Sequence, residues 1–104
     1  MRVVIAEDLF LLREGLASLL KEHGFDIAEA VADGPSLVRA LIDQQPDVAI
    51  VDVRLPPTHT DEGLRAALQA RQQVPGLPIL VLSAHVEQLY TRYAMCGRFR
   101  GPSE

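Results

Sequence analysis

The segment Val48–Val53 (VAIVDV) is apolar at every position except Asp52. Arg2–Ala6 (RVVIA) and Pro78–Ser83 (PILVLS) are also rich in Val, Ile or Leu at consecutive positions. A strand that is apolar at consecutive positions is buried on both faces, which is typical of a parallel sheet covered by helices. These three runs therefore predict the central strands of such a sheet.

A fourth run, Asp26–Val31 (DIAEAV), alternates in character. A period of two predicts that Ile27 and Glu29 share one face of a strand, while Ala28 and Ala30 share the other. This pattern suits a strand near the edge of the sheet.

Apolar residues at helical spacing lie between these strands, and each group ends at a Gly or Pro. The expected stripes are Leu12, Leu16, Leu19 and Leu20 before Gly24, then Leu37, Ala40 and Leu41 before Pro46, then Leu64, Ala67 and Leu68 before Pro75. A fourth helix is expected from near His85. Strands that alternate with helices at this spacing predict a three-layer α/β/α domain.

Right-handed crossovers give this parallel sheet the strand order 2-1-3-4. A ligand crevice then opens at the carboxyl ends of the first and third strands, where the winding direction reverses. Glu7 and Asp8 follow the first strand, and Asp52 lies at the end of the third. Three carboxylates so close repel one another unless a cation lies between them, and Mg²⁺ prefers oxygen ligands. The sequence therefore predicts a magnesium site.

Each of these residues also has a simpler interpretation. An acidic residue at a strand end often caps the following turn. Ser83, which ends the fourth strand, is of a type common at helix N-caps, although a hydroxyl beside the acids could donate to a phosphoryl oxygen. The convergence of three acids favours the functional interpretation.

The composition indicates a globular domain and excludes several other classes of protein. A chain of 104 residues with 48% hydrophobic residues forms one globular domain, and its net charge of −4 argues against a nucleic-acid surface. Cys96 is the only cysteine, so we expect a reducing, cytoplasmic location. The acids Glu7 and Asp8 interrupt the first apolar run, so neither a signal peptide nor a membrane span is expected.

Three segments, Ile5–Leu16 (IAEDLFLLREGL), Pro46–Gly63 (PDVAIVDVRLPPTHTDEG) and Pro78–His85 (PILVLSAH), have the order and spacing of a family motif. On them the chain resembles the receiver domains of two-component response regulators, which have a flavodoxin-like (CheY-like) fold. The segments around Asp8 and Pro56 further resemble receivers that precede a LuxR-type DNA-binding domain.

The resemblance implies a role for each matching residue. Asp52 would accept a phosphoryl group from a sensor histidine kinase, and Ser83 would hydrogen-bond that group. Mg²⁺ would be held by Glu7, Asp8, Asp52 and the main-chain carbonyl of Arg54. Arg54 and His85 would tune the lifetime of the phosphoryl group, and Pro56 would shape the loop.

The chain departs from this family towards its C-terminal end. Receivers have a fifth strand that carries a lysine, and a fifth helix, but residues 97–104 (GRFRGPSE) hold no Val/Ile-rich run and Lys21 is the only lysine. We therefore expect an incomplete receiver at residues 1–96 and a short polar tail at 97–104. The fourth strand would be an open edge, which favours a homodimer through that edge or through exchanged elements.

Two other functions stay open. A pseudo-receiver would keep the fold but act as a dimerisation module without phosphate, and the missing lysine favours it. A Mg²⁺-dependent aspartyl phosphatase is disfavoured because no cap insert and no acid two positions after Asp52 are present. His59 is expected to be a solvated loop residue and His23 to complement a helix end. Any contact with DNA would need a domain outside this sequence.

Overall fold

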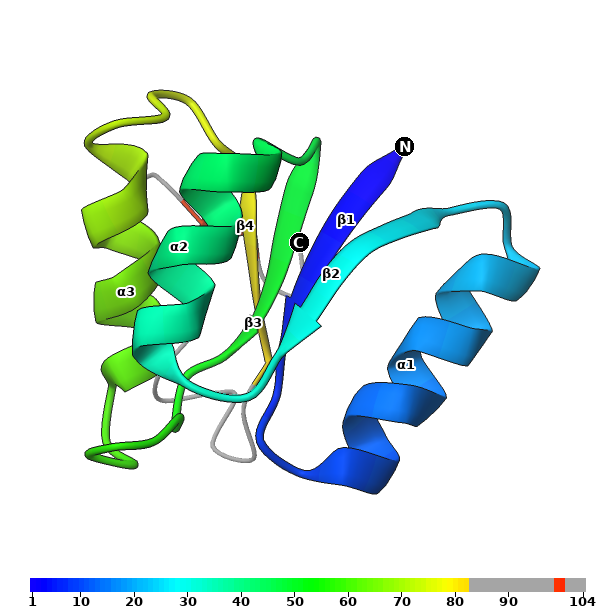
Figure 1. Ribbon diagram of the computed structural model, residues 1–104, viewed down its shortest axis with the longest axis horizontal. Coiled ribbons are helices and arrows are strands. Elements are labelled where there is room, and N and C mark those ends of the chain that lie inside the picture. The colour runs from blue at the N-terminus through cyan, green and yellow to red at the C-terminus, as the bar shows by residue number, and fades with distance from the viewer. Residues whose placement is uncertain (83–98, 101–104) are drawn as a thin grey trace.

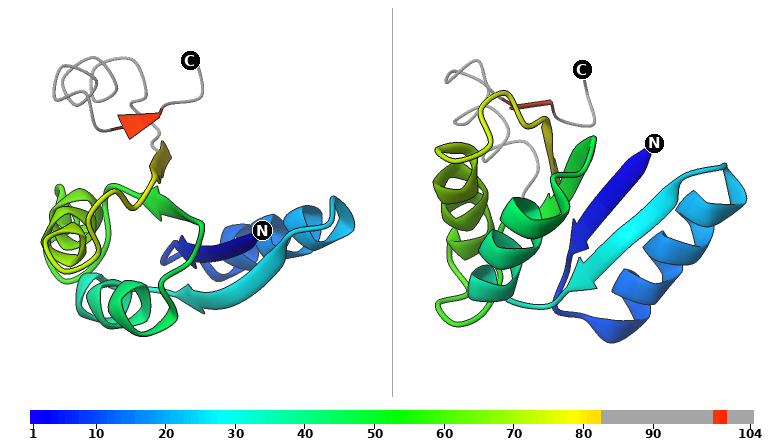
Figure 2. Two further views of the ribbon diagram at one scale, coloured as in Figure 1. Left: turned by 90° about the horizontal axis from the view of Figure 1, so that it is seen from above. Right: turned by 45° about the horizontal axis from the view of Figure 1, so that its top comes forward.

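A computed structural model describes residues 1–82 and 99–100 of the chain. Along the chain its elements are β1 (Arg2–Ala6), α1 (Phe10–Glu22), β2 (Asp26–Val31), α2 (Gly34–Gln44), β3 (Val48–Asp52), α3 (Glu62–Arg71), β4 (Ile79–Leu82) and β5 (Phe99–Arg100). The parallel sheet has the order β2-β1-β3-β4-β5. Helices α2 and α3 cover one face of the sheet and α1 lies on the other (Figures 1 and 2). The predicted three-layer fold and the order 2-1-3-4 are confirmed.

The prediction that no fifth strand exists is wrong. Phe99 and Arg100 pair in parallel with Ile79 and Leu80 of β4, at the position next to β4 in the sheet. A ladder is formed by backbone groups, so two residues can extend a sheet without a Val/Ile-rich pattern. The predicted polar tail thus contains a strand, and β4 is not an open edge at these two positions. The open edge on which the expected homodimer depended is therefore absent at Ile79 and Leu80.

The larger apolar cluster lies between the sheet and the α2–α3 layer. Leu37, Ala40 and Leu41 of α2 and Leu64 and Ala67 of α3 are buried in it, as their spacing predicted. At the start of α2, the side chain of Asp33 accepts a hydrogen bond from the Ser36 N–H and so caps the helix. Within the residues described, no helix has the length and apolarity that crossing a bilayer requires.

The stripe predicted for α1 is only partly correct. Leu16 and Leu20 pack around buried Ala17 against the second apolar cluster, but Leu12 and Leu19 are 46% and 52% exposed. Helix α1 packs on β1 and β2 at one side of the sheet, so only one flank of its leucine stripe meets the sheet. Periodicity alone cannot show which part of a wide apolar stripe is covered.

A β-bulge corrects the prediction for β2. Val3 pairs with Ile27, but Val4 pairs with Glu29, so β2 carries one extra residue. Ile27 and Ala30 consequently pack together on the α1 side, instead of on opposite faces. The shift places Glu29 on the α2 side, where its carboxylate forms an ion pair with Arg39.

The first turn of α3 lies against the end of β3 with almost no space between them. The Gly63 N–H donates to the Val53 carbonyl at 2.8 Å. A Cβ atom on Gly63 would lie 1.9 Å from the Asp52 carbonyl oxygen, far inside van der Waals contact. Only glycine allows α3 to begin this close to the end of the strand.

We expect Gly63→Ala to lower the free energy of unfolding by about 2–3 kcal/mol, because α3 must shift away from β3. Gly15→Ala is the matched control, since nothing lies within 4 Å of a Cβ at that position of α1. The control should gain about 0.5–1 kcal/mol from helix propensity. Urea denaturation of both variants tests this, and equal stability of the two would contradict the close approach.

Candidate functional site

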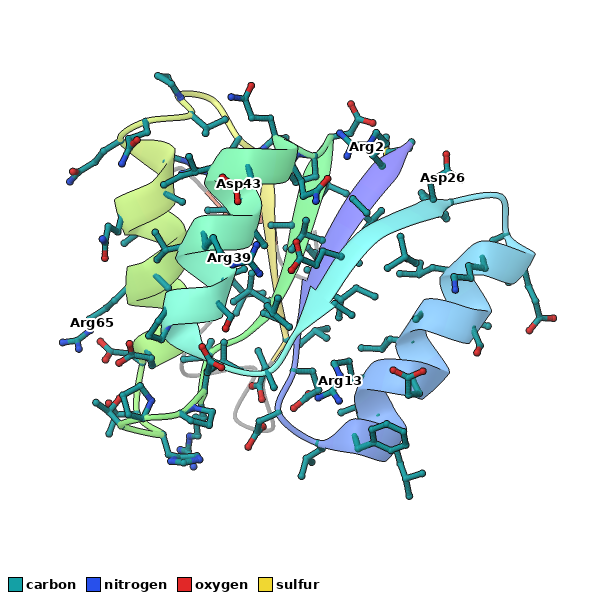
Figure 3. The ribbon with its side chains drawn as sticks, in the orientation of Figure 1. Arg2, Arg13, Asp26, Arg39, Asp43 and Arg65 are labelled. Carbon is teal, nitrogen blue, oxygen red and sulfur yellow. The ribbon has the colours of Figure 1, made fainter. Side chains whose placement is uncertain are left out.

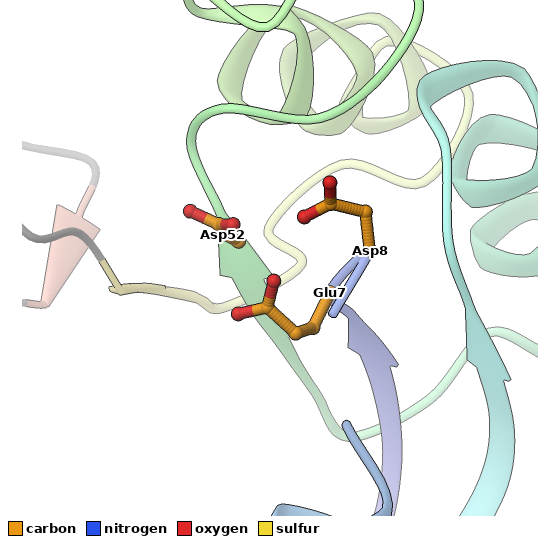
Figure 4. A group of neighbouring side chains, drawn as sticks. All are labelled: Glu7, Asp8 and Asp52. Carbon is orange, nitrogen blue, oxygen red and sulfur yellow. The ribbon is translucent and has the colours of Figure 1, made fainter. Parts of the chain in front are cut away.

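The site is built by the pairing of the two central strands. Val3–Ala6 of β1 pair in register with Val48–Val51 of β3, so the next residue of each strand, Glu7 or Asp52, lies at the same edge. The Glu7 N–H donates to the Val31 carbonyl, which holds the end of β1 beside β2. The carboxylates of Glu7, Asp8 and Asp52 converge (Figure 4), and one oxygen atom from each lies within 4.8 Å of the other two.

Burial makes this cluster electrostatically unfavourable when it is fully ionised. Glu7 is only 2% exposed. Its burial raises the pKa of the Glu7 carboxyl to about 7, against a hydrogen bond from the Leu9 N–H that lowers it, and Asp52 raises it further. Burial also raises the pKa of Asp52, whose Oδ1 accepts a hydrogen bond from the Arg54 N–H at 3.3 Å. Both carboxyls therefore resist ionisation in the absence of a cation.

These residues fit a hard divalent cation. They supply three carboxylates in one cluster, and a positive ion would offset the burial and the repulsion that raise the pKa values of Glu7 and Asp52. Such a donor set, made of oxygen alone, suits Mg²⁺ better than a softer transition metal.

His59 lies at the border of the site. It has a positive φ of 56° in the loop between β3 and α3, and its Nε2 is 3.7 Å from Asp8 Oδ2. Its side chain is largely exposed, as predicted, but the ring faces an acid of the site. It is not one of the residues that form the three-carboxylate cluster. His23 lies at the C-cap of α1, where its Nδ1 is 2.9 Å from the Leu19 carbonyl oxygen.

Arg13 is a residue of the site that the sequence analysis missed. Its guanidinium reaches back from α1 and donates to the main-chain carbonyl of Glu7 at 2.9 Å (Figure 3). The Arg13 side chain also lies over the Phe10 ring, 5.5 Å from its centroid. It thereby anchors the turn between β1 and α1 that carries Glu7 and Asp8. The sequence did place Arg13 on the same helix face as Leu16 and Leu20, which could have indicated that its side chain is turned towards the sheet.

The loop after Asp52 is tied to the start of α2. The Gly34 N–H donates to the Pro56 carbonyl at 3.0 Å, and Leu55 is fully buried. Pro56 thus contributes an anchor for the loop. Arg54 lies between buried neighbours and is itself exposed. Ser83 and His85 lie outside the described residues, as do Cys96 and the helix expected from near His85.

Residues 3–99 match the family described as "Response regulator receiver domain". The chain belongs to this family. It is therefore the receiver domain of a two-component response regulator, a signalling domain. Receiver domains generally bind Mg²⁺ at an acidic pocket and interact with histidine kinases.

Curated relatives of this receiver include two regulatory proteins and one enzyme. The transcriptional regulatory protein PdtaR of Mycobacterium tuberculosis is 38% identical over 84 residues, 80% of this chain and 38% of its own length. The oxygen regulatory protein NreC of Staphylococcus carnosus is 28% identical over 97% of this chain and 46% of its own length. A protein-glutamate methylesterase/protein-glutamine glutaminase of Haloarcula marismortui is 32% identical over 84% of this chain and 22% of its own length. The receiver thus spans less than half of each relative.

Solved structures agree on the fold. A LuxR-family response regulator from Aurantimonas has a TM-score of 0.83 at 24% identity, covering 96% of this chain and 70% of that one. A CheY-like receiver from Methanospirillum hungatei has a TM-score of 0.81 at 15% identity, covering 96% of this chain and 77% of that one. The receiver fold is therefore retained at low sequence identity.

Without divalent cations, the receiver should become less stable as pH rises from about 4.5 through 7. An unfolded Glu7 loses its proton near the ordinary value of 4.5, whereas the folded carboxyl keeps it until about 7, so the folded state binds more protons in this window. The expected loss is on the order of 1–3 kcal/mol between pH 5 and 8. Denaturant titrations across this range in a chelating buffer measure it.

Glu7→Gln is the control for this pH dependence. The amide cannot ionise, so the variant should be more stable than the parent at pH 8 and show a flatter profile. An identical slope in parent and variant would show that Glu7 is not the group responsible.

Proposed function

We propose that this receiver relays a signal by accepting a phosphoryl group on Asp52, in a site that Mg²⁺ completes. The observation that carries the proposal is the convergence of Glu7, Asp8 and Asp52 at the ends of two neighbouring strands. Glu7, Asp8, Asp52 and the main-chain carbonyl of Arg54 would hold the ion. The membership of the chain in the receiver family supports these assignments.

The chemistry needs little from the protein beyond positioning and charge. The Asp52 carboxylate attacks the phosphorus of a phosphohistidine on the kinase, and a P–O bond forms as the P–N bond breaks. The electron pair of that bond returns to the imidazole nitrogen, which takes up a proton. Bound Mg²⁺ would neutralise the charge on the phosphoryl oxygens, and in-line positioning supplies much of the remaining acceleration.

Other residues modulate this reaction in our proposal. The hydroxyl of Ser83 donates a hydrogen bond to the phosphoryl group, and Arg54 and His85 tune its lifetime. Pro56 shapes the loop after Asp52, which its carbonyl fastens to Gly34. The added phosphoryl charge then biases the conformation of the loops that a partner recognises.

The partners follow from the same proposal. A sensor histidine kinase donates the phosphoryl group, and a DNA-binding domain outside this sequence receives the signal, as suits a relative of a transcriptional regulatory protein. The single cysteine of the sequence suits a cytoplasmic location. The domain does not turn over a small substrate.

The pseudo-receiver remains a second candidate on one observation. Lys21, the only lysine of the sequence, lies in the last turn of α1 and not at the acidic cluster. A receiver without a lysine at its site could retain the fold and signal through association alone.

Incubation with acetyl phosphate and Mg²⁺ should add one phosphoryl group to Asp52, detected by intact-protein mass spectrometry. Asp52→Asn should abolish the addition because its amide is not a nucleophile of comparable strength. Asp26→Asn, which removes an exposed carboxylate at the opposite end of the sheet, is the matched control and should react normally. Absence of modification in the parent chain would favour the pseudo-receiver instead.

Asp8→Asn should weaken Mg²⁺ binding about tenfold, because it removes one negative charge from the ligand cluster. Isothermal titration calorimetry at pH 8, above the pKa of about 7 of Glu7, measures the affinity. Asp26→Asn should bind Mg²⁺ as the parent does. Equal affinities of Asp8→Asn and Asp26→Asn would place the ion elsewhere.

A further inference from the structure

We propose that the guanidinium of Arg54 is the cationic side chain that contacts the phosphoryl group on Asp52. This inference rests on the proposed function and adds to it the identity of the protein's own positive charge at the site. It assigns Arg54 an attractive contact with the phosphoryl oxygens, in addition to the main-chain role expected of its carbonyl.

The backbone fixes Arg54 close to the acceptor. Its N–H donates to Asp52 Oδ1 at 3.3 Å, so the two residues form a tight local turn. The Val53 N–H donates to the Leu82 carbonyl of β4 at 3.2 Å, and the side chains of Val53 and Leu55 are buried. Arg54 therefore extends an exposed side chain from a main chain that is held on both sides.

The other arginines of residues 1–82 are already engaged. Arg2 donates to Gln44, Arg13 to the Glu7 carbonyl and Arg71 to the Leu77 carbonyl, while Arg39 pairs with Glu29 and Arg65 with Asp61 and Glu62. Lys21 lies in the last turn of α1, 12 residues after Leu9, which is the N-cap of this helix. About 18 Å of helix therefore separates Lys21 from the helix end that follows Glu7 and Asp8. Within residues 1–82, Arg54 is the arginine whose side chain forms no hydrogen bond or ion pair, and it lies beside Asp52.

The electrostatics of the site favour a positively charged side chain beside Asp52. Two further carboxylates, those of Glu7 and Asp8, lie beside the acceptor, and phosphorylation replaces the single charge of Asp52 with about 1.5–2 negative charges. The positive charge of Arg54 already acts on Asp52, where it lowers the pKa of the carboxyl in opposition to the larger effect of burial. A guanidinium can bind two phosphoryl oxygens at once, a geometry that a point charge cannot match.

The reaction with acetyl phosphate isolates this contact from any kinase. A carboxylate oxygen of Asp52 attacks phosphorus, the bond from phosphorus to the acetyl oxygen breaks, and its electron pair leaves on acetate. No net proton transfer or redox change is needed. Arg54 would stabilise the negative charge on the three oxygens that phosphorus carries through the transfer.

The experiment compares Arg54→Met, Arg54→Lys and Arg65→Met in the full chain. Arg65→Met removes the same charge from α3, where Arg65 pairs with Asp61 and Glu62, and so controls for net charge. The initial rate of Asp52 phosphorylation by acetyl phosphate is measured at saturating Mg²⁺. The Mg²⁺ dissociation constant is measured separately, by calorimetry without phosphodonor.

Arg54→Met should lower the phosphorylation rate about tenfold or more, whereas Arg65→Met should leave it within about twofold. The same Arg54→Met change should tighten Mg²⁺ binding about two- to fivefold, because a repelling positive charge is lost. Arg54→Lys should recover part of the rate. A loss of local structure would weaken both properties together, so their opposite signs identify a direct electrostatic role.

Two results would overturn the inference while leaving the proposed function intact. One is a parent chain that is phosphorylated on Asp52 at the same rate as Arg54→Met. The other is an Arg54→Met variant that loses rate and Mg²⁺ affinity together. A parent chain that takes no phosphoryl group would remove the proposed function and this inference with it.

Discussion

The in-register pairing of β1 with β3 is the constraint on which this receiver depends. Four consecutive apolar residues of each strand are paired, and the chain reaches its acids at the same level on both strands. Because apolar side chains cover both faces, a slip in register would move buried residues out of their clusters as well as separate Glu7 from Asp52. The packing that stabilises the fold therefore also enforces the repulsion among the carboxylates.

That repulsion gives the site its chemistry. A buried Glu7 with a raised pKa is unfavourable for a fold that has no cation, and natural proteins tolerate such groups mainly where function requires them. The surroundings hold the acids in place by backbone contacts. Arg13 binds the carbonyl of Glu7, and Gly63 allows α3 to begin against the Asp52 carbonyl. These backbone contacts keep the acids together although their charges repel one another.

The sequence was sufficient to predict the features that depend on a regular apolar pattern or on the order of the strands. The consecutive apolar residues of β1 and β3 predicted their burial, and right-handed crossovers then placed Glu7 beside Asp52. The bulge in β2 could not be predicted from the sequence. A bulge reverses the face on which each later residue of the strand lies, but it leaves no characteristic residue type in the sequence. Strand β5 was missed because two backbone ladder positions leave no side-chain pattern. Arg13 was missed because its partner is a main-chain carbonyl, which no sequence motif displays.

The loop between β3 and α3 explains how a charge on Asp52 can affect residues that do not touch it. Arg54 begins this loop beside the acceptor, Pro56 is hydrogen-bonded to Gly34 at the start of α2, and Thr58 donates to Glu62 of α3. Glu62 and Gly34 in turn line a cavity of about 470 Å³ between the two helices. Any strain that a phosphoryl group on Asp52 places on this loop would reach the two helices at these hydrogen bonds. The cavity between α2 and α3 therefore lies beside the two points at which the loop is joined to these helices.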